Sequence, residues 1–345
     1  MRRFLVLLVL AFAFCGCSRV TVPKQTVFLS CQVDSIPYRI PALAELQNGS
    51  VILLADYRHC FSDIGFGRVD IRGKVLSPYG RRWSKEFALI EGTGIEGAVD
   101  CGYGDPSIVA DRETEDVLVA LVCGNTIYWH PSTTRQNPNR ISLMRSSDSG
   151  KTWAVLGDLS QLPAPYGDEP KCEELPDGRV VLSSRAMGGR YFNIYTYTDS
   201  TTGEGSWDEP APSGKRAKGC ISLENACNGE ILILPAVRNS DKTQVMLALQ
   251  SVPFGPGRIN VGIYAKELPS DISSITAEVF AADWNIKYQV SDTWSAYSTM
   301  IQLSNGNIAF YYEESHNGMT TTYDMIYQEL SIETITSGLY SASVR

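Results

Sequence analysis

Apolar stretches that are broken by glycine-containing turns recur along this chain and predict β-hairpins. In residues 41–58, the run PALAELQ leads into Asn48-Gly49, and a second apolar run follows. Asn-Gly and Asp-Gly are strong hairpin signals, because the central positions of the tight turn must accept positive φ. The same arrangement occurs at residues 171–186, 221–238 and 299–314, and with a longer connection at residues 107–124. Helical periodicity is almost absent, so the pattern predicts an all-β protein.

The spacing of these hairpins predicts how they assemble. The turn glycines are Gly49, Gly178, Gly229 and Gly306. They lie one or two units of about 50–65 residues apart, which is the length of a four-stranded propeller blade. We therefore expect a six-bladed β-propeller that forms a single domain over residues 18–345.

Charged residues end the second strand of several predicted hairpins. Arg58 lies nine residues after its turn glycine, and Arg185 and Glu313 each lie seven residues after theirs. Odd offsets place these side chains on the same face of their strands. Arg238, nine residues after Gly229, shares this parity. The pattern predicts a polar mouth at one end of the propeller axis.

Composition restricts the classes of partner and cofactor. The chain has 345 residues, 43% of them hydrophobic, and a formal net charge of −8 without a basic run, which argues against a nucleic-acid partner. An anionic substrate would need a local arginine cluster. Seven cysteines follow residue 17, an odd number without C-x-x-C spacing, and we expect most of them to be buried as small hydrophobic residues. Three histidines without an H-E-x-x-H motif argue against a metal, and we expect no cofactor.

The first 17 residues read as an export signal. Arg2 and Arg3 precede an apolar run from Phe4 to Phe14, which is too short to span a bilayer as a helix. The ending Cys15-Gly16-Cys17 resembles a bacterial lipoprotein signal with Cys17 as the lipidated residue, and the alternative is an ordinary secretory signal cut nearby. Either signal predicts export. We expect an outer-membrane lipoprotein that faces the periplasm or the cell surface and touches the membrane only through its lipid.

Residues 146–153 match the pattern S-x-D-x-G-x-T-W at every position. Ser146 and Asp148 can accept hydrogen bonds from the turn's own amides, Gly150 supplies an unusual backbone conformation, and Trp153 anchors the turn in apolar surroundings. The segment resembles the Asp-box of sialidases and other β-propellers. That motif is structural and carries no chemistry.

Four further motifs give the chain a resemblance to one enzyme family. They are Tyr38-Arg39-Ile40-Pro41, the stretch DEPKCEELPDGRVVLSSR that contains Glu169 and Arg185, Ser295-Ala296-Tyr297-Ser298, and PFGPGRINVGIYAK, which contains Arg258. Taken in chain order, in which PFGPGRINVGIYAK precedes Ser295, and together with the Asp-box, they resemble the sialidase family (exo-α-sialidases, neuraminidases) over nearly the whole mature chain.

The resemblance implies an arginine triad for the substrate carboxylate. Arg39 and Arg185 match its first two members, and Arg258 matches the third, with Arg238 as the alternative. Guanidinium groups suit this task because their fork of donors fits two carboxylate oxygens and stays charged at any working pH.

The resemblance also implies the catalytic residues. Tyr297 matches the nucleophile and Glu169 the base that removes its proton, because a phenol with a pKa near 10 needs such help. Asp63 matches the acid/base aspartate on a loop after the first hairpin. Glu173 and Glu174 compete with Glu169 by residue type and read as solvated charges on the strand, and the competitors of Asp63 are Asp56 and Asp70.

Other positions match groups around the sugar. Arg58 and Asp105 match residues near its 4-position, Glu313 matches the glutamate that orients Arg39, and Trp129 is a candidate wall for the acetamido group. The chain would then be a monomeric exo-α-sialidase that releases terminal sialic acid from sialylated glycans with retention. The alternatives are an inactive glycan-binding propeller, and a glycosidase or trans-sialidase for a related keto-sugar acid.

Overall fold

The computed structural model describes residues 21–80, 82–111, 116–124, 144–145, 152, 154–155, 157, 163–165, 169–225, 227–315 and 322–343. Cys17, Trp129 and all of the Asp-box except Thr152 lie outside these residues, so the expectations placed on them stay predictions. Strands dominate the described ranges, and the α-helices are the short α1 (Ala277–Ala281) and α2 (Ile332–Ile335). Neither is long and apolar enough to cross a membrane.

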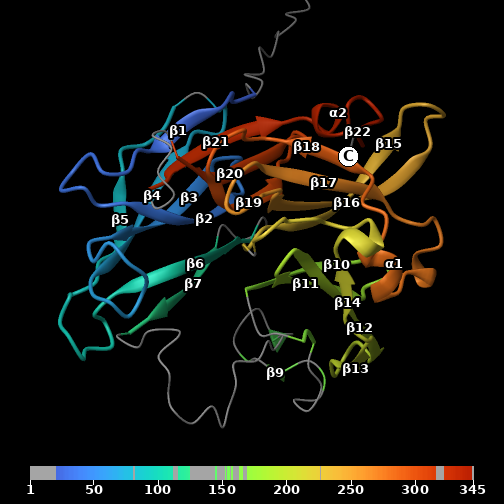
Figure 1. Cartoon of the computed structure of the whole chain (residues 1–345), viewed down its shortest axis with the longest axis horizontal. Coiled ribbons are helices and arrows are strands. Elements are labelled where there is room, and N and C mark those ends of the chain that lie inside the picture. Colours follow the sequence, from blue (N-terminus) through green and yellow to red (C-terminus); the bar gives the residue numbers. More distant parts are fainter. Residues whose placement is uncertain are drawn as a thin grey trace, which may run out of the picture.

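Four antiparallel sheets of four or five strands fan around a common centre (Figure 1). In the first sheet the strands follow chain order and are β2 (Tyr38–Glu45), β3 (Val51–Arg58), β4 (Val69–Leu76) and β5 (Phe87–Ile90). The second sheet contains β10 (Pro170–Glu174), β11 (Val180–Ala186), β12 (Gly189–Asp199), β13 (Glu204–Trp207) and β14 (Ala211–Ser213).

The other two large sheets come from the second half of the chain. One contains β15 (Ile231–Arg238), β16 (Gln244–Pro253), β17 (Val261–Glu267), β18 (Ile286–Gln289) and β22 (Tyr340–Ala342). The other contains β19 (Ser295–Gln302), β20 (Ile308–Glu314), β21 (Asp324–Leu330) and, as its outer strand, β1 (Gln25–Phe28). The N-terminal strand thus completes the sheet of the C-terminal strands.

The all-β propeller-like arrangement is confirmed, but the expected six four-stranded blades are not. Within the described ranges there are four blades of four or five strands and two two-stranded sheets, β6 (Tyr103–Ala110) with β7 (Val117–Cys123) and β8 (Met144–Arg145) with β9 (Ala154–Val155). The count of six was extrapolated from the repeat length. No repeated hairpin marks residues 125–168, so the sequence pattern could not set the strand number there.

The hairpin expected at residues 221–238 is also wrong. Residues 221–225 form no strand beside β15, and Gly229 is not a turn glycine. A Cβ on Gly229 would lie 1.8 Å from the backbone oxygen of Ser251, so glycine is needed there for close approach to β16. Because β15 starts at the centre and runs outward, Arg238 lies at the far end, where it pairs with Glu267 and Asp241.

Apolar clusters fill the spaces between neighbouring blades. All seven residues of β20 are buried, because the blades on either side cover both of its faces. This double burial explains why its first five residues, IAFYY, form a continuous apolar run and do not alternate. The cysteines depart from expectation: all seven from Cys31 onward are free, and only Cys101, Cys220 and Cys227 are buried.

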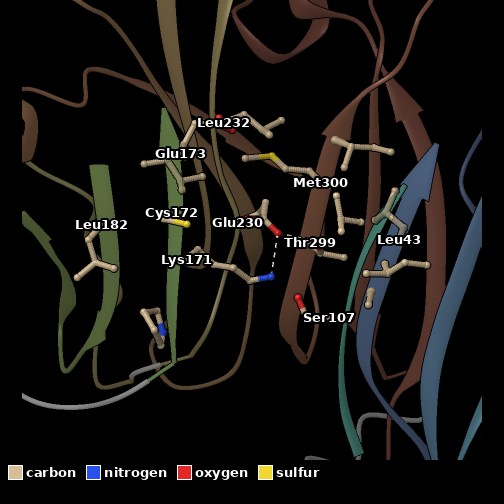
Figure 2. Close-up of a pocket in the computed structure, with 16 residues that line it drawn as sticks. Leu43, Ser107, Lys171, Cys172, Glu173, Leu182, Glu230, Leu232, Thr299 and Met300 are labelled. Atoms are coloured by element: carbon tan, nitrogen blue, oxygen red, sulfur yellow. Dashed lines mark hydrogen bonds and ion pairs between the residues drawn. The ribbon is translucent and has the colours of Figure 1, made fainter. Parts of the chain in front are cut away.

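The innermost strands surround a cavity of about 540 Å³ on the axis (Figure 2). The strands β2, β6, β10 and β19 contribute to its wall, together with the start of β15. This axial arrangement brings the beginnings of strands that are far apart in sequence to one end of the molecule.

Candidate active site

Three of the inner strands have, at or near their start, a residue with positive φ directly before a proline. Ile40-Pro41, Asp105-Pro106 and Glu169-Pro170 each place a residue with positive φ, at 54°, 51° and 25°, directly before a proline. Such values are unfavourable for residues other than glycine and concentrate at functional sites. The three pairs are 65 and 64 residues apart, a regular spacing that our sequence analysis missed and that could have aligned these strands.

β-Bulges occur at two of these positive-φ–proline pairs and on β19. The pairing register shifts between Arg39 and Ala42, between Gly104 and Ser107, and between Ser295 and Ser298 on β19. A bulge bends a strand and redirects its side chains, and bulges are common beside active sites. They explain why Arg39, Asp105 and Tyr297 project into the mouth of the axis.

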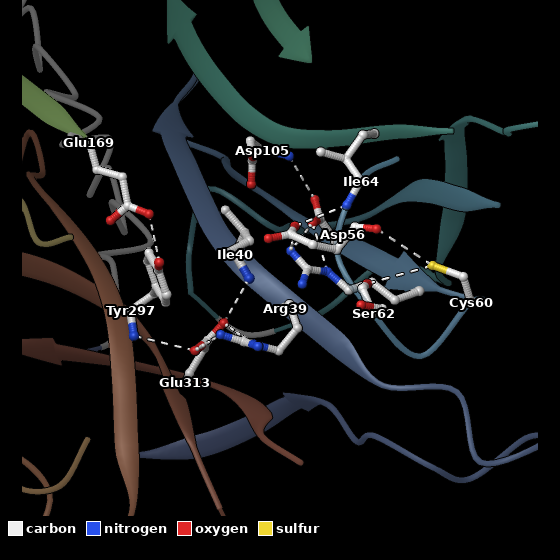
Figure 3. A network of polar contacts seen from close by, with 12 residues as sticks. Arg39, Ile40, Asp56, Cys60, Ser62, Ile64, Asp105, Glu169, Tyr297 and Glu313 are labelled. Carbon is white, nitrogen blue, oxygen red and sulfur yellow. Dashed lines mark hydrogen bonds and ion pairs between the residues drawn. The ribbon is translucent and has the colours of Figure 1, made fainter. Parts of the chain in front are cut away.

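Tyr297 forms the centre of the site (Figure 3). Its hydroxyl donates a hydrogen bond of 2.6 Å to Glu169 Oε1. Arg185 Nη1 lies 2.8 Å from the same carboxylate oxygen and donates to the tyrosine oxygen at 3.2 Å. Within the described residues, Glu169 Oε2 has no hydrogen-bond partner although it is buried.

The surroundings of Tyr297 oppose loss of its proton. Burial and the nearby Cys227 and Glu169 raise the pKa of the phenol well above its usual value, while Arg185 acts in the opposite direction. An ionised Tyr297 therefore requires a base within hydrogen-bond distance, and Glu169 is in that position.

Two more arginines pack on the tyrosine ring. The Cζ of Arg39 lies 5.7 Å from the ring centroid and that of Arg258 lies 5.3 Å from it. Together with Arg185, they place three guanidinium groups around one phenol. Arg238, the alternative third arginine, lies far from this cluster, at the outer end of β15.

Glu313 fixes the first of these arginines. Its fully buried carboxylate accepts hydrogen bonds from Arg39 Nε at 2.7 Å and Nη2 at 3.2 Å. It also accepts from the backbone amides of Ile40 at 2.8 Å and Tyr297 at 3.3 Å. One side chain on β20 thus holds the bulged segments of β2 and β19 together.

A second polar group lies across the mouth. Arg58 binds the buried carboxylate of Asp56 at 2.8 Å and lies 3.0 Å from Asp63 Oδ1. The backbone amide of Asp105 donates to Asp56 at 3.0 Å. Asp63 is more exposed than the other two candidates for the acid/base aspartate, with 38% of its side chain accessible, because Asp56 and Asp70 are buried in ion pairs.

Burial changes the acidity of this group. Desolvation raises the pKa of Asp56 to about 7, and it outweighs the lowering effect of Arg58. The pKa of Asp105 is raised to about 6 by the protein around its carboxyl, and Asp63 and Glu169 add to this against Arg58. Because Asp105 keeps an exposed surface toward the cavity, its carboxyl can still titrate and meet a ligand.

The two glutamates that compete with Glu169 lie elsewhere. Glu174 is exposed, in agreement with a solvated charge. Glu173 lines the axial cavity, where burial raises its pKa to about 7, so the expectation that it is solvated is wrong.

A cavity of about 330 Å³ opens between these groups. Its wall includes Ile40, Asp105, Glu169, Asn228 and Tyr297. Across the ranges that the structure describes, no group of three or more His, Cys, Asp or Glu side chains is arranged to hold a metal ion.

The fold is that of sialidase-type β-propellers. The chain is similar to the leech intramolecular trans-sialidase, with a TM-score of 0.67 and 13% identity over 92% of this chain and 71% of that one. It is also similar to the NanB sialidase of Streptococcus pneumoniae, with a TM-score of 0.60 and 13% identity over 93% of this chain and 71% of that one.

Sequence comparison adds a homologous segment. Over 138 residues the chain is 30% identical to a sialidase of Bacteroides fragilis, a match that covers 37% of this chain and 25% of that protein. The matched segment is thus only a quarter of the relative's length. No family model matches the chain.

Proposed function

We propose that this protein is an exo-α-sialidase that hydrolyses terminal α-linked sialic acid with retention. The observation that carries the proposal is the 2.6 Å hydrogen bond between Tyr297 and Glu169 within a cluster of three arginines. A lone tyrosine–carboxylate pair has no evident chemistry. Three guanidinium groups around it supply a site for an anionic substrate next to a nucleophile.

A tyrosine nucleophile fits this class of substrate. The anomeric carbon of sialic acid carries a carboxylate, which would repel an attacking aspartate or glutamate, and sialidases are known exceptions to two-carboxylate glycosidases. In the first step Glu169 takes the phenolic proton while Tyr297 attacks the anomeric carbon. Arg185, which contacts both groups, stabilises the negative charge as it moves from one to the other.

Asp63 supplies the proton for the leaving group. In its protonated form it gives a proton to the glycosidic oxygen as the bond breaks, and as a carboxylate it then takes a proton from the water that cleaves the tyrosyl intermediate. The exposed side chain of Asp63 on the loop after β3 suits this role, because leaving group and water enter from the solvent side.

The remaining groups would bind the sugar. Arg39, Arg185 and Arg258 hold the carboxylate, and Glu313 keeps Arg39 in position. Arg58 and Asp105 face the 4-hydroxyl, the arginine as donor and the carboxylate as acceptor.

We extend the proposal to the whole protein. The signal-like segment with Cys17 supports export and a lipid anchor, and we further propose that the mature chain is a monomer with one catalytic domain. Its substrates would be sialylated glycans at the bacterial envelope, cleaved without a cofactor.

The test is release of a fluorophore from a synthetic α-sialoside by the purified mature protein, with the deaminated sialoside measured in parallel. Proton NMR during the reaction should show the α-anomer of free sialic acid first, the result of two inverting steps. Release of the β-anomer first would overturn the tyrosine mechanism. An anhydro sugar in place of free sialic acid would indicate intramolecular transfer, the reaction named for the leech enzyme, and binding without turnover would indicate a glycan-binding propeller.

A further inference from the structure

A polar contact crosses the axial cavity between β10 and β19 (Figure 2). The ammonium of Lys171 on β10 lies 3.1 Å from Glu230 Oε2, and the hydroxyl of Thr299 on β19 donates to the same oxygen at 2.9 Å. Glu230 itself comes directly before β15. One carboxylate oxygen therefore links three inner strands across a cavity whose wall is otherwise largely apolar.

The sequence positions of these partners relate them to the proposed catalytic pair. Lys171 follows Glu169 by two residues, and Thr299 follows Tyr297 by two. Glu169 lies just before β10 and Tyr297 lies in the bulge of β19, yet both pairs line the same cavity of about 330 Å³. Glu230 thus binds the side chain two residues after the base on one strand and the side chain two residues after the nucleophile on the other.

Glu230 is held firmly by its own backbone. Its amide donates to Ser251 Oγ at 2.9 Å, and its carbonyl accepts from the Ser251 amide at 2.9 Å and from Gln250 Nε2 at 3.0 Å. Gly229 permits this close approach to β16. The carboxylate is therefore a fixed point to which the two neighbouring strands attach.

The base needs such a restraint. Glu169 directly precedes β10, at the start of a strand that pairs with β11 on one side and faces the cavity on the other. Its backbone has an unfavourable positive φ of 25°. An error of about 1 Å in the placement of reacting groups can reduce catalysis about 100-fold.

We propose that Glu230 is a positioning residue, which aligns β10 with β19 through Lys171 and Thr299 and thereby sets the contact between Glu169 and Tyr297. Its kinetic consequence rests on the sialidase function proposed above. The structural consequence, the placement of Glu169 relative to Tyr297, holds for whatever ligand the site takes.

Glu230→Ala is the direct test, with Glu173→Ala as its matched control. Glu173 lines the same cavity on the same strand, but its carboxylate bonds only to the amide of Glu174 among the described residues. We expect Glu230→Ala to lower kcat on an aryl α-sialoside about 10- to 100-fold. The dissociation constant of an unsaturated sialic acid analogue should change less than about threefold, because the arginine cluster is untouched. Glu173→Ala should keep wild-type kcat.

Conservative variants distinguish a loss of alignment between β10 and β19 from a general destabilisation of the site. Thr299→Val removes only the donor and should lower kcat, whereas Thr299→Ser keeps the donor and should restore it. Lys171→Met and Thr299→Val act through one oxygen, so the double variant should lose less than the product of the two single effects. Equal loss of kcat and of analogue affinity in Glu230→Ala, or equal kcat for Val and Ser at position 299, would overturn the proposal.

A crystal structure of Glu230→Ala decides the question without any assay. The distance between Glu169 Oε1 and Tyr297 Oη should exceed hydrogen-bonding range, and a distance unchanged from 2.6 Å would overturn the positioning role. If wild-type protein releases no sugar, the sialidase proposal fails by itself, and this measurement still tests the role of Glu230.

Discussion

Single side chains of ordinary type acquire their chemistry here from their neighbours. The phenol of Tyr297 is a poor nucleophile in isolation, and its burial makes it poorer by raising its pKa. Glu169 raises this pKa further but is placed to accept the proton, whereas Arg185 lowers the pKa and faces the charge that remains. The site is thus defined by a contact between residues that are 128 positions apart in sequence.

The substitution Tyr297→Phe tests this division of labour. It removes the nucleophilic oxygen and leaves the three arginines, so turnover should fall about 10³-fold or more. Affinity for an unsaturated sialic acid analogue should remain within a few-fold of wild type, measured by calorimetry. A variant that retains substantial turnover would show that another group attacks the sugar.

The third arginine is tested by a pair of variants. Arg258→Ala should weaken analogue binding by about 2–4 kcal/mol, because it removes a charged contact to the substrate carboxylate. Arg238→Ala should leave affinity unchanged, since Arg238 pairs with Glu267 at the other end of its strand. The reverse result would mean that the substrate does not lie beside the Tyr297 ring.

Asp105 predicts a pH dependence of binding. In the proposed site its carboxyl, with a pKa of about 6, accepts a hydrogen bond from a hydroxyl of the sugar more strongly when ionised. Affinity should therefore rise as pH rises through 6 and be up to about tenfold weaker at pH 5 than at pH 7. Asp105→Asn keeps an acceptor that does not titrate, so its affinity should vary less between pH 5 and 7. An unchanged pH profile in this variant would assign the titration to another group, such as Asp56.

At the scale of elements, the sequence predicted three hairpins correctly but misplaced the turn and the strands of a fourth. The hairpins at residues 41–58, 171–186 and 299–314 form as β2–β3, β10–β11 and β19–β20. Residues 221–238 have the same pattern of two apolar runs around an Asn-Gly pair, but this pair lies directly before the start of β15 and forms no turn. A local turn signal cannot distinguish positive φ from close backbone approach, because glycine serves both. Arg238 was therefore placed at the wrong end of its strand.

Other parts of the site depend on burial and on contacts between distant strands, which only the structure shows. The order of short motifs selected Tyr297, Glu169 and Arg39 as neighbours, and the structure brings these residues together. The choice among Asp63, Asp56 and Asp70 depends on burial, which their positions in the sequence do not reveal. The role of Glu230 depends on two contacts from distant strands.

Glycine substitutions distinguish the two uses of this residue. Gly229→Ala would place a methyl group on the backbone of Ser251, so we expect a loss of at least about 2–3 kcal/mol of unfolding free energy. Gly178→Ala, at a true turn with φ of 86° and no close neighbour, should cost about 1–2 kcal/mol. Urea unfolding of both variants gives the comparison, and equal losses would contradict the close approach.

On the scale of the whole molecule, the outer strand of the last blade comes from the other end of the chain. The pairing of β1 with β21 buries Val27 and Phe28 against the C-terminal strands. Phe28→Ala should lower the unfolding free energy by about 3–5 kcal/mol, as for other large buried aromatic residues. The nearby exposed residue Leu29 is the control, because Leu29→Ala should cost less than about 1 kcal/mol. Similar losses in the two variants would mean that β1 is not part of the core.

The pairing of β1 with β21 affects the order in which the blades can fold during synthesis. Thr26 pairs with Ile326, so the first strand to be made must wait for a partner that is translated 300 residues later. At typical elongation rates of about 5–20 residues per second, that interval is about 15–60 s. Over this time the early blades can fold from local contacts, while the apolar residues of β1 stay without their partner and are exposed to aggregation. The last blade is therefore the step at which a nascent chain is most open to misfolding.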